Sequence, residues 1–343
     1  MAFINQLEPW GLLREFSQAP PAGFRSLTSV DGVPMFDTPF DLLTTADDSM
    51  RTSLRRVPGL PRLLRWRTRF VGSTVSEYAL FPPGADPLAM ARQLRVEQGG
   101  ARALLIVKDL PTQSPLLSAD ENAWAAAFAQ ACMAEGFVLL DGQALAWVPI
   151  DFADEDAYLA RLSASRRKNI RRKLRSRADL DIQAVPTGPA LAAPAHLDEM
   201  VALYENVYAQ SQIHFDRLQP AYLRALFADA DSGGTVFLYR HAGRLIGWNL
   251  CYEYRGRLVD KYIGLAYPQA RTHNLYAVSW MHNLAHARER GLSAYVAGWT
   301  DAEVKASLGA RFTPTRHAVF ARNRLLRAVL RRMAGRFEAE AAS

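Results

Sequence analysis

The chain has 343 residues, of which 49% are hydrophobic and 10% aromatic, so it can bury a large core and is long enough for two domains of about 150 residues. This composition excludes a disordered protein. The net charge is +7, and the two cysteines, Cys132 and Cys251, are too few for a disulfide framework or a cysteine-rich metal site. We find no apolar run of about 18 residues and no secretory signal, and therefore expect a reduced, cytoplasmic protein.

The first half of the sequence alternates strand and helix patterns after an irregular start. Prolines repeatedly interrupt residues 1–64. The patterns that follow predict strands and one long helix that ends at Gly136: strands at 70–81, 103–107, 137–140 and 145–150, and the helix at 121–135. We therefore expect residues 1–150 to form an N-terminal α/β domain.

A basic helix follows at 161–177, with the sequence RLSASRRKNIRRKLRSR. Nine of its seventeen residues are Lys or Arg and none is acidic. Leu162, Ile170 and Leu174 form a thin apolar stripe at helical spacing, so cationic side chains cover the rest of the helix. Such a surface indicates an anionic ligand, and the alternatives are a solvated surface helix or a nucleic-acid-binding segment.

The second half carries the clearest pattern, an antiparallel meander followed by alternating helices and strands. Strands are expected at 182–185, 235–240, 244–254, 257–265, 294–297 and 316–321, and helices at 197–209, 220–228, 275–290 and 301–308. Arg255-Gly256 is the predicted turn between the two longest strands. We expect residues 151–323 to form a second domain and residues 324–343 to form a basic amphipathic helix and tail.

Both halves place a long helix that ends at a glycine, Gly136 or Gly291, between strands. An ancient duplication would leave this order, although the similarity between the halves is too weak to establish one.

The order of strand, turn, strand, short loop and long helix resembles the acyl-CoA N-acyltransferase (GNAT) superfamily. SRRKNIRRKLR in the basic helix, DKYIGLAYP at 260–268 with the NLY after it, and EVKASLGARF at 303–312 are similar to the branch that contains Fem-type peptidoglycan aminoacyltransferases. The resemblance covers residues 151–323. It implies an α/β (α+β) fold with a mixed, mainly antiparallel sheet flanked by helices. By analogy with Fem-type enzymes, it implies two tandem GNAT-like domains, the first degenerate.

The resemblance also implies an N-acyltransferase. Its acyl group would come from a thioester, acyl-CoA or an acyl-carrier protein, and would pass to an amine of a small-molecule, lipid-precursor or cell-envelope acceptor. The thioester would be a co-substrate, with no tightly bound cofactor and no metal. A second hypothesis is Fem-type transfer from a charged tRNA, which the basic helix favours, although the long helical hairpin of several Fem enzymes is not visible. A third is a non-catalytic module that binds nucleic acid or membrane.

In the family, the loop after the fourth strand offers backbone N–H groups at a helix N-terminus to the pyrophosphate of the donor. The corresponding loop here is Gln269-Ala270-Arg271-Thr272-His273-Asn274. It lacks the glycines that allow close backbone approach. Three interpretations remain: the loop holds phosphate with the help of Arg271, the donor is not coenzyme A, or the loop is an ordinary connection.

A two-residue turn at Arg255-Gly256 fixes the register of the strands beside it. That register places Cys251 opposite Asp260 and Asn249 opposite Tyr262. Asn249, Glu253, Asp260 and Tyr262 then share one face of the sheet, unless a β-bulge shifts the downstream half.

Acyl transfer to an amine needs a base for the ammonium proton and an acid for the leaving group. The candidate catalytic residues are therefore Asp260, Glu253 and Tyr262, with Tyr295 as a further donor. For each of them the alternative is a solvated side chain on a half-exposed sheet.

The candidate substrate-binding residues are polar side chains of the basic helix and the expected cleft: Arg166, Lys168, Asn169, Arg172, Asn249 and Lys305. Lys305 lies where Fem-like relatives tend to have a lysine near the acceptor. His282 and His286 have the spacing of a shared metal site, but no third ligand is apparent, so structural histidines are the preferred interpretation.

Residues 323–337 place Leu326, Val329, Leu330, Met333 and Phe337 on one side of an arginine-rich helix. Such a helix can dock on its own domain, with arginine stems covering the edges, or lie on an anionic membrane surface. We expect docking, with peripheral contact to the inner membrane as the alternative.

Overall fold

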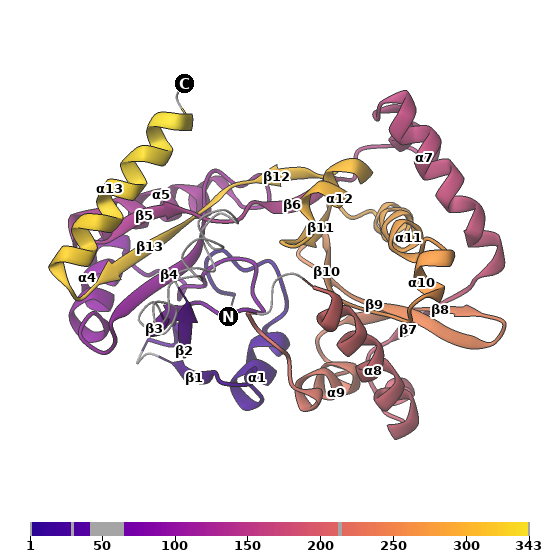
Figure 1. The fold of residues 1–343 in the computed structure, drawn as a ribbon, viewed down its shortest axis with the longest axis horizontal. Helices are drawn as coiled ribbons and strands as arrows, with labels where there is room; N and C mark the ends of the chain where they lie inside the picture. The colour runs from indigo at the N-terminus through magenta and orange to yellow at the C-terminus, as the bar shows by residue number, and fades with distance from the viewer. Residues whose placement is uncertain (1, 29–30, 42–64, 212–214, 342–343) are drawn as a thin grey trace, which may run out of the picture. The chain divides into compact units, whose positions relative to one another are not determined.

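The computed structural model of the chain describes residues 2–28, 31–41, 65–211 and 215–341 (Figure 1). It contains two compact units, each with its own sheet and core. Unit 1 comprises Met1–Gln6, Gly23–Gln143 and Pro314–Ser343, and unit 2 comprises Leu7–Ala22 and Ala144–Thr313. The linear boundaries expected from the sequence thus differ from the units at both ends, because an N-terminal segment joins unit 2 and the C-terminal strand joins unit 1.

Unit 1 is built on a six-stranded sheet in the order β1-β2-β3-β4-β13-β5. Its strands are β1 (Arg25–Thr28), β2 (Pro34–Asp41), β3 (Arg65–Val71), β4 (Leu104–Pro111), β5 (Val138–Asp141) and β13 (Thr315–Ala321). Strand pairing is antiparallel except between β3 and β4. The mixed, mainly antiparallel sheet is the expected fold class.

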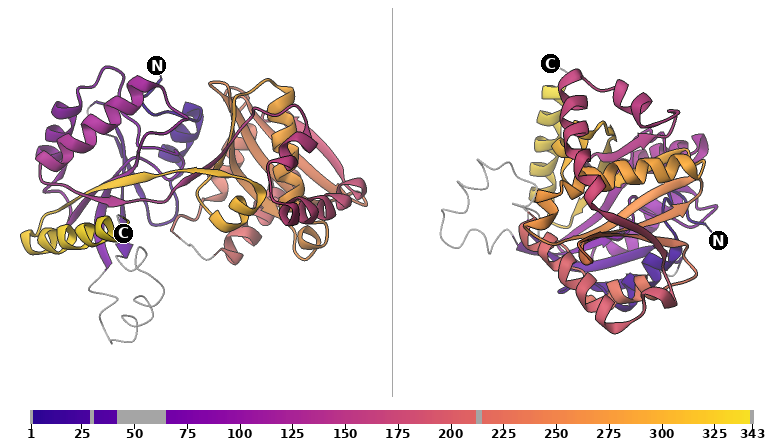
Figure 2. Two further views of the ribbon diagram at one scale, coloured as in Figure 1. Left: turned by 90° about the horizontal axis from the view of Figure 1, so that it is seen from above. Right: turned by 90° about the vertical axis from the view of Figure 1, so that its right-hand side faces the viewer.

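Two helices of unit 1, α4 (Pro87–Gln98) and α5 (Ala119–Ala134), pack side by side (Figures 1 and 2). The sequence predicts α5 closely. Its first turn is closed by a capping box, in which the Ser118 hydroxyl accepts from the Glu121 amide and the Glu121 carboxylate accepts from the Ser118 amide. Gly136, at φ +87°, ends it in the conformation that glycine adopts most readily.

The strand expected at 70–81 is wrong beyond Val71. Gly72, at φ +114°, turns the chain, and the Ser73 hydroxyl then accepts the amides of Val75 and Ser76. These bonds close a turn that competes with a strand ladder. The apolar residues that suggested a strand are instead buried in a compact loop, in which Val75, Tyr78, Ala79 and Leu80 are each at most 1% exposed.

Helix α13 (Arg324–Ala341) follows the last strand of unit 1. Leu330 is 8% exposed, and the Arg327 guanidinium lies 4.2 Å from the centre of the Phe320 ring, so this side of the helix docks. Val329, expected on the docked side, is 53% exposed, and Leu325 is 78% exposed. The side chains of Met333 and Phe337 lie outside the described part of the helix.

Unit 2 is built on a seven-stranded sheet in the order β12-β6-β11-β10-β9-β8-β7. Its strands are β6 (Leu145–Pro149), β7 (Asp181–Pro186), β8 (Gly234–His241), β9 (Arg244–Tyr254), β10 (Arg257–Leu265), β11 (Ala294–Gly298) and β12 (Arg311–Thr313). The Arg255-Gly256 turn is confirmed, with Tyr254 paired to Arg257 and both turn residues at positive φ.

Helices cover both faces of this sheet (Figures 1 and 2). They are α1 (Trp10–Gln18), α6 (Glu155–Ala160), α7 (Ala164–Leu174), α8 (Pro194–Gln210), α9 (Pro220–Ala228), α10 (Gln269–Thr272), α11 (Leu275–Glu289) and α12 (Ala302–Leu308). On one face Trp248 donates its indole N–H to the Met200 carbonyl of α8. On the other, Phe237 lies against the His282 ring of α11, with centroids 4.7 Å apart.

The fit between the sheet of unit 2 and α8 depends on Gly264. A Cβ at this position would lie 2.2 Å from Nε1 of Trp248 and 2.9 Å from Cβ of Leu203. We predict that Gly264→Ala lowers the free energy of unfolding by about 1–3 kcal/mol, because a fully buried indole must move. Chemical denaturation measures this change. Gly100→Ala, where no atom lies within 4 Å of the added Cβ, is the matched control, and equal stability of the two variants would contradict the prediction.

Candidate active site

The candidate site of unit 2 begins where two parallel strands separate. β10 and β11 pair only from Arg257 to Val259, opposite Ala294 to Val296. β10 continues to Leu265 and β11 to Gly298. Beyond Val259, therefore, the backbone groups on one edge of β10 have no ladder partner in β11 and are available to a substrate.

A β-bulge lies at the same point of β10. Asp260 pairs with Cys251 of β9 as expected, but the register shifts there, so that Tyr262 pairs with Leu250 and Ile263 with Asn249. The expected pairing of Asn249 with Tyr262 is therefore wrong. The extra residue, Lys261, has no counterpart in β9, and it turns the downstream side chains to the opposite face.

Asp260 lies at the centre of a polar cluster beneath α11. Its carboxylate accepts hydrogen bonds from the Tyr295 hydroxyl at 2.6 Å, from Asn249 Nδ2 at 2.6 Å and from Asn283 Nδ2 at 3.2 Å. Asn283 Nδ2 also donates to Asn249 Oδ1 at 2.7 Å and to the Tyr295 hydroxyl at 3.2 Å. The structure thus brings together two sequence candidates, Asp260 and Asn249, with Tyr295 as the phenol.

Burial and these partners act on Asp260 in opposite directions. Burial raises the pKa of the Asp260 carboxyl above its ordinary 3.8, and the donors Tyr295 and Asn249 and the charge of Lys305 lower it. Burial and the neighbouring Asp260 raise the pKa of Tyr295, which keeps its proton at neutral pH. The cluster therefore holds a proton acceptor and a proton donor that are hydrogen-bonded to each other.

Tyr262, a candidate catalytic residue, lies away from this cluster. Its hydroxyl is 3.2 Å from that of Tyr222 on α9, and burial raises the pKa of both phenols. The bulge at Lys261 is the cause, since it turns Tyr262 toward the α8 and α9 face.

Glu253, the other candidate base, shares the face of Asp260 but has other partners. Its carboxylate lies 3.0 Å from Nε2 of His286 and 3.0 Å from Nε of Arg290, at the end of α11. These contacts occupy the carboxylate in an ion pair, so the geometry favours Asp260 as the base.

The loop expected to bind the donor, Gln269 to Asn274, is folded into the short helix α10. Each backbone N–H from Ala270 to Asn274 already donates to a carbonyl within residues 266–271, at 2.7–3.1 Å. Arg271 donates to Oε1 of Gln210 and lies 5.0 Å from the Tyr267 ring centre. A pyrophosphate bound to these amides would have to replace bonds that the helix already makes.

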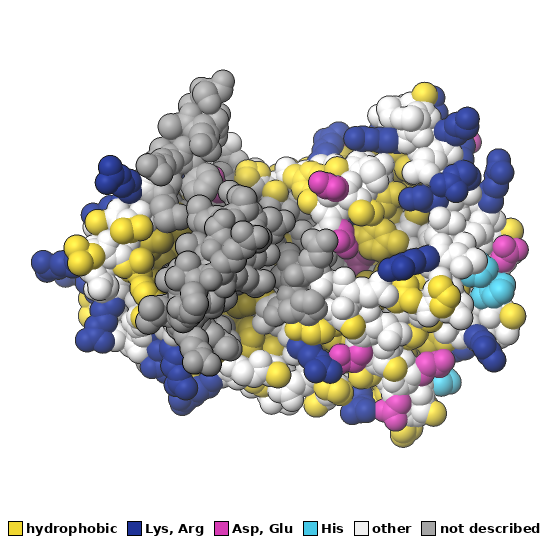
Figure 3. Space-filling view, viewed as in Figure 1, with side chains coloured by type: hydrophobic (Ala, Val, Ile, Leu, Met, Phe, Trp, Pro, Cys, Tyr) yellow, Lys and Arg dark blue, Asp and Glu magenta, His cyan; other side chains and the backbone are white. Residues whose placement is uncertain are grey.

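The basic helix α7 presents most of its cations to solvent. Figure 3 shows Lys and Arg side chains gathered over α7. Among the described residues, five of its cations have no carboxylate within 4.0 Å: Arg166, Arg167, Lys168, Arg172 and Lys173. The same holds for Arg175, in the 3-10 turn that follows α7. Arg166 contacts the Ala306 carbonyl and Arg172 the side chain of Asn169, while Ile170 and Leu174 are buried in the core, as the apolar stripe predicts.

Lys305, expected near an anionic acceptor, is 4% exposed. Its Nζ donates to the Ala297 carbonyl at 2.6 Å, at the end of β11 that β10 has left. Its charge acts on Asp260 through space. Lys305 thus closes one side of the candidate site.

Sequence reasoning missed Asn283, which is fully buried and contacts Asn249, Asp260 and Tyr295. Its spacing in the sequence could have indicated it: Asn283 lies on the same helical face as the apolar residues Trp280, Leu284 and Ala287, which predicts a buried polar side chain on the inward face of α11. The nearby His282 is neutral, because burial lowers its pKa to about 4. No group of three metal-ligating side chains occurs in the part of the chain that the structure describes.

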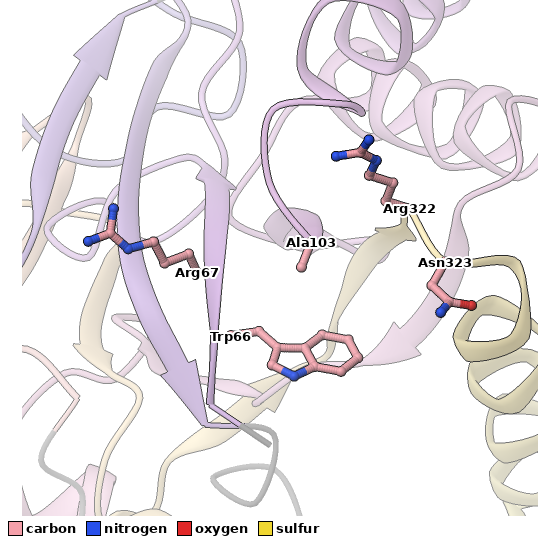
Figure 4. Close-up of a pocket in the computed structure, with 5 residues that line it drawn as sticks. All are labelled: Trp66, Arg67, Ala103, Arg322 and Asn323. Atoms are coloured by element: carbon pink, nitrogen blue, oxygen red, sulfur yellow. The ribbon is translucent and has the colours of Figure 1, made fainter. Parts of the chain in front are cut away.

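Unit 1 contains a cavity of about 680 Å³ lined by Trp66, Arg67, Ala103, Arg322 and Asn323. In Figure 4, Trp66 and Asn323 face the cavity, while both guanidinium groups point away from it. These lining residues offer no general base. Among the described residues, no helix has both the length and the apolar character needed to cross a membrane.

The raised pKa of Asp260 predicts a pH-dependent stability. The folded state holds the Asp260 proton to higher pH than the unfolded state does, so stability is lost as pH rises from about 4 through the folded-state pKa. Asp260→Asn removes the titratable carboxyl. The free energy of unfolding of the wild type should therefore fall relative to that of the variant as the pH rises over this range. Parallel urea titrations measure the difference, and two pH profiles that run parallel from pH 4 to 8 would contradict it.

Comparison with known proteins gives a match over the segment that carries this site. Residues 164–306, from the first residue of α7 into α12, match the family model described as "Acetyltransferase (GNAT) domain". No curated protein matches the chain.

Several solved structures share the fold at low identity. The C-terminal domain of a putative lysylphosphatidylglycerol synthetase from Agrobacterium fabrum has a TM-score of 0.56 at 13% identity, over 95% of this chain and 89% of that one. The L-PGS structure from Bacillus licheniformis has 0.53 at 11%, over 96% and 98%. FemX has 0.54 at 12%, over 95% and 94%. The chain shares its fold with these proteins, and its residues 164–306 match the acetyltransferase (GNAT) domain.

Proposed function

We propose that unit 2 transfers an acyl group from an activated donor to the amine of an acceptor, with Asp260 as the base and Tyr295 as the acid. The observation that carries this proposal is the 2.6 Å hydrogen bond between these two residues at the point where β10 leaves β11. A carboxylate and a protonated phenol in contact provide both proton transfers of the reaction.

The steps follow from the protonation states. Asp260 takes a proton from the acceptor ammonium, and the free amine attacks the acyl carbon. The bond from that carbon to the donor oxygen or sulfur then breaks. The leaving group takes the Tyr295 proton, and Tyr295 recovers one from Asp260. The Asp260 carboxylate, free again, takes the second proton from the nitrogen of the new amide and releases it to solvent. The raised pKa of Asp260 brings it closer to that of the ammonium, which eases the first step.

We further propose that the donor is an aminoacyl-tRNA. The amides of the 270–274 segment are already bonded, so they are poorly suited to a pyrophosphate. The exposed cations of α7 suit a long polyanion instead. One of the proteins that share this fold is named as a putative lysylphosphatidylglycerol synthetase, and that name describes an aminoacylated product.

A thioester donor, acyl-CoA or an acyl-carrier protein, is the second candidate. The match of residues 164–306 to a family model named for acetyltransferases favours it. In either case the donor is a co-substrate that is consumed. A turnover screen with acyl-CoAs, acyl-carrier proteins and charged tRNAs, each with small and lipid-linked amines, tests the function. A folded protein that is inactive with all three donor classes would overturn it.

The unpaired cations of α7 provide a test of the donor. We predict that Lys168→Ala/Arg172→Ala/Arg175→Ala weakens tRNA binding and lowers the salt slope by about one for each lost phosphate contact. The matched control is Arg161→Ala/Arg171→Ala, in the same basic segment, where both cations already face carboxylates. Fluorescence anisotropy over a range of salt concentrations measures both, and equal slopes in the two variants would count against the tRNA donor.

We propose that α13 contacts an anionic membrane, where a lipid-linked acceptor would lie. Leu325 and Val329 are exposed on this helix together with Arg324, Arg331 and Arg332. We predict that Leu325→Asp/Val329→Asp reduces sedimentation with phosphatidylglycerol vesicles several-fold, because it removes apolar contact and adds negative charge. Val96→Asp, at an exposed valine of α4, is the control, and unchanged sedimentation of the double variant would contradict this role of α13.

A further inference from the structure

Asn283 connects helix α11 to three strands of unit 2. Its side chain is 0% exposed. Its Nδ2 lies 2.7 Å from Oδ1 of Asn249 on β9, 3.2 Å from Oδ2 of Asp260 on β10 and 3.2 Å from the hydroxyl of Tyr295 on β11. Every polar group of the candidate active-site cluster is therefore within hydrogen-bond distance of this one amide.

These neighbours determine how the Asn283 amide is oriented. Asp260 Oδ2 and Asn249 Oδ1 can only accept while Asp260 is ionised, so the donor nitrogen of Asn283 must face them. Its oxygen, Oδ1, is then left buried without a hydrogen-bond partner among the described residues. A buried unpaired oxygen destabilises the fold.

The same contacts determine the orientation of the other two donors. Because Asn249 Oδ1 accepts from Asn283, its Nδ2 is directed at Asp260 Oδ1, 2.6 Å away. Because the Tyr295 oxygen accepts from Asn283, its own proton is free to donate to Asp260 Oδ2. Asn283 has two N–H groups for three acceptors, so one donates to Asn249 Oδ1 and the other is shared between the Tyr295 oxygen and Asp260 Oδ2. In this way Asn283 aligns two donors with the carboxylate.

We propose that Asn283 is a positioning residue that holds Asp260 ionised and keeps Tyr295 directed at it. This inference rests on the proposed function of the Asp260 and Tyr295 pair. A role in helix packing alone does not account for the amide, because a leucine would fill the space without leaving an orphaned oxygen. Hydrogen bonds to the ionised form of a carboxyl are what keep a buried carboxylate charged.

Other groups also influence the charge of Asp260. Lys261 on its own strand and Lys305 on α12 favour the ionised form. Four further titratable groups interact with it: Tyr239 on β8, Cys251 on β9, Tyr276 on α11 and Tyr295 on β11. Burial raises the pKa of each of these four, so all stay neutral near pH 7. A change at Asn283 therefore shifts the titration of Asp260 without altering another charge near it.

The test replaces Asn283 with leucine, which is similar in size and lacks the donors. We expect the acid limb of the kcat/KM profile to move to higher pH by about one unit, with activity recovered partly as the pH is raised. Ser279→Ala is the matched control, since Ser279 is buried on the same helix but its hydroxyl bonds within it, to the Tyr276 carbonyl. A uniform loss of kcat/KM at every pH would overturn the proposal.

A second variant and a second readout keep the test decisive. Asn283→Asp has almost the same shape and places an acceptor against Asp260, so its acid limb should move further than that of Asn283→Leu. The pH dependence of unfolding gives the same information without turnover. Asn283→Leu, which adds no titratable group, should change it in the wild-type background and have no effect on it in the Asp260→Asn background.

These outcomes separate the two hypotheses. If no donor is turned over but the unfolding profiles differ as expected, the acyl-transfer function fails while the control of Asp260 by Asn283 stands. If turnover is found and both the acid limb and the unfolding profile are unmoved in Asn283→Leu and Asn283→Asp, Asn283 is a packing residue and this inference fails.

Discussion

The separation of β10 from β11 after Val259 is the constraint on which the candidate site depends. It leaves one edge of β10 without ladder partners, and it frees the Ala297 carbonyl of β11, which Lys305 then binds. A lysine that is 4% exposed is costly unless it has a partner. Its interaction with that carbonyl and with the charge of Asp260 explains how a cation and a carboxylate persist side by side within an apolar core.

Unit 1 has the same junction in a form that is closed. Its parallel strands β3 and β4 stop pairing at Val71 and Val107, and the chain then folds back beside β4, where the Ala79 amide donates to the Asp109 carbonyl. Lys108 binds the Ser73 carbonyl at 2.9 Å. The position that is open at β10 is thus filled here by the protein's own loop.

Local chemistry made much of the fold predictable from the sequence. The Arg255-Gly256 turn, the end of α5 at Gly136 and the apolar stripe of α7 each depend on residues near one another in the chain, and each was predicted. The bulge at Lys261 could not be predicted from such a pattern. The register with the bulge and the register without it both place apolar side chains on both faces of β10. Pairing of β13 with β4 and β5 depends on contacts between residues about two hundred positions apart, and the periodicity of the sequence carries no information about such contacts.

The candidate site was predictable to the same extent. Asp260 followed from the register before the bulge. Asn249 followed from the alternation of side chains along β9, although its pairing partner did not, and Tyr262 was misplaced because it lies after the bulge. Asn283 comes from a different element, and only the packing of α11 on the sheet brings it to Asp260. Pairing across a hairpin can be counted along the sequence, whereas the contact of a helix side chain with a strand depends on how the layers pack.

Under the proposed function, anion recognition in this chain has a different physical basis from that of a glycine-rich loop. Backbone amides at a helix N-terminus act at hydrogen-bond distance and select one phosphate geometry. Here the corresponding amides bond within α10, and the available positive charge is on the side chains of α7. Side-chain cations act over about a Debye length, roughly 8 Å at physiological salt, and select for the number of phosphates. Under the proposed function, a site of this kind would distinguish donors by the length of their anionic carrier, and Asp260 and Tyr295 would act on whichever acyl group that carrier delivers.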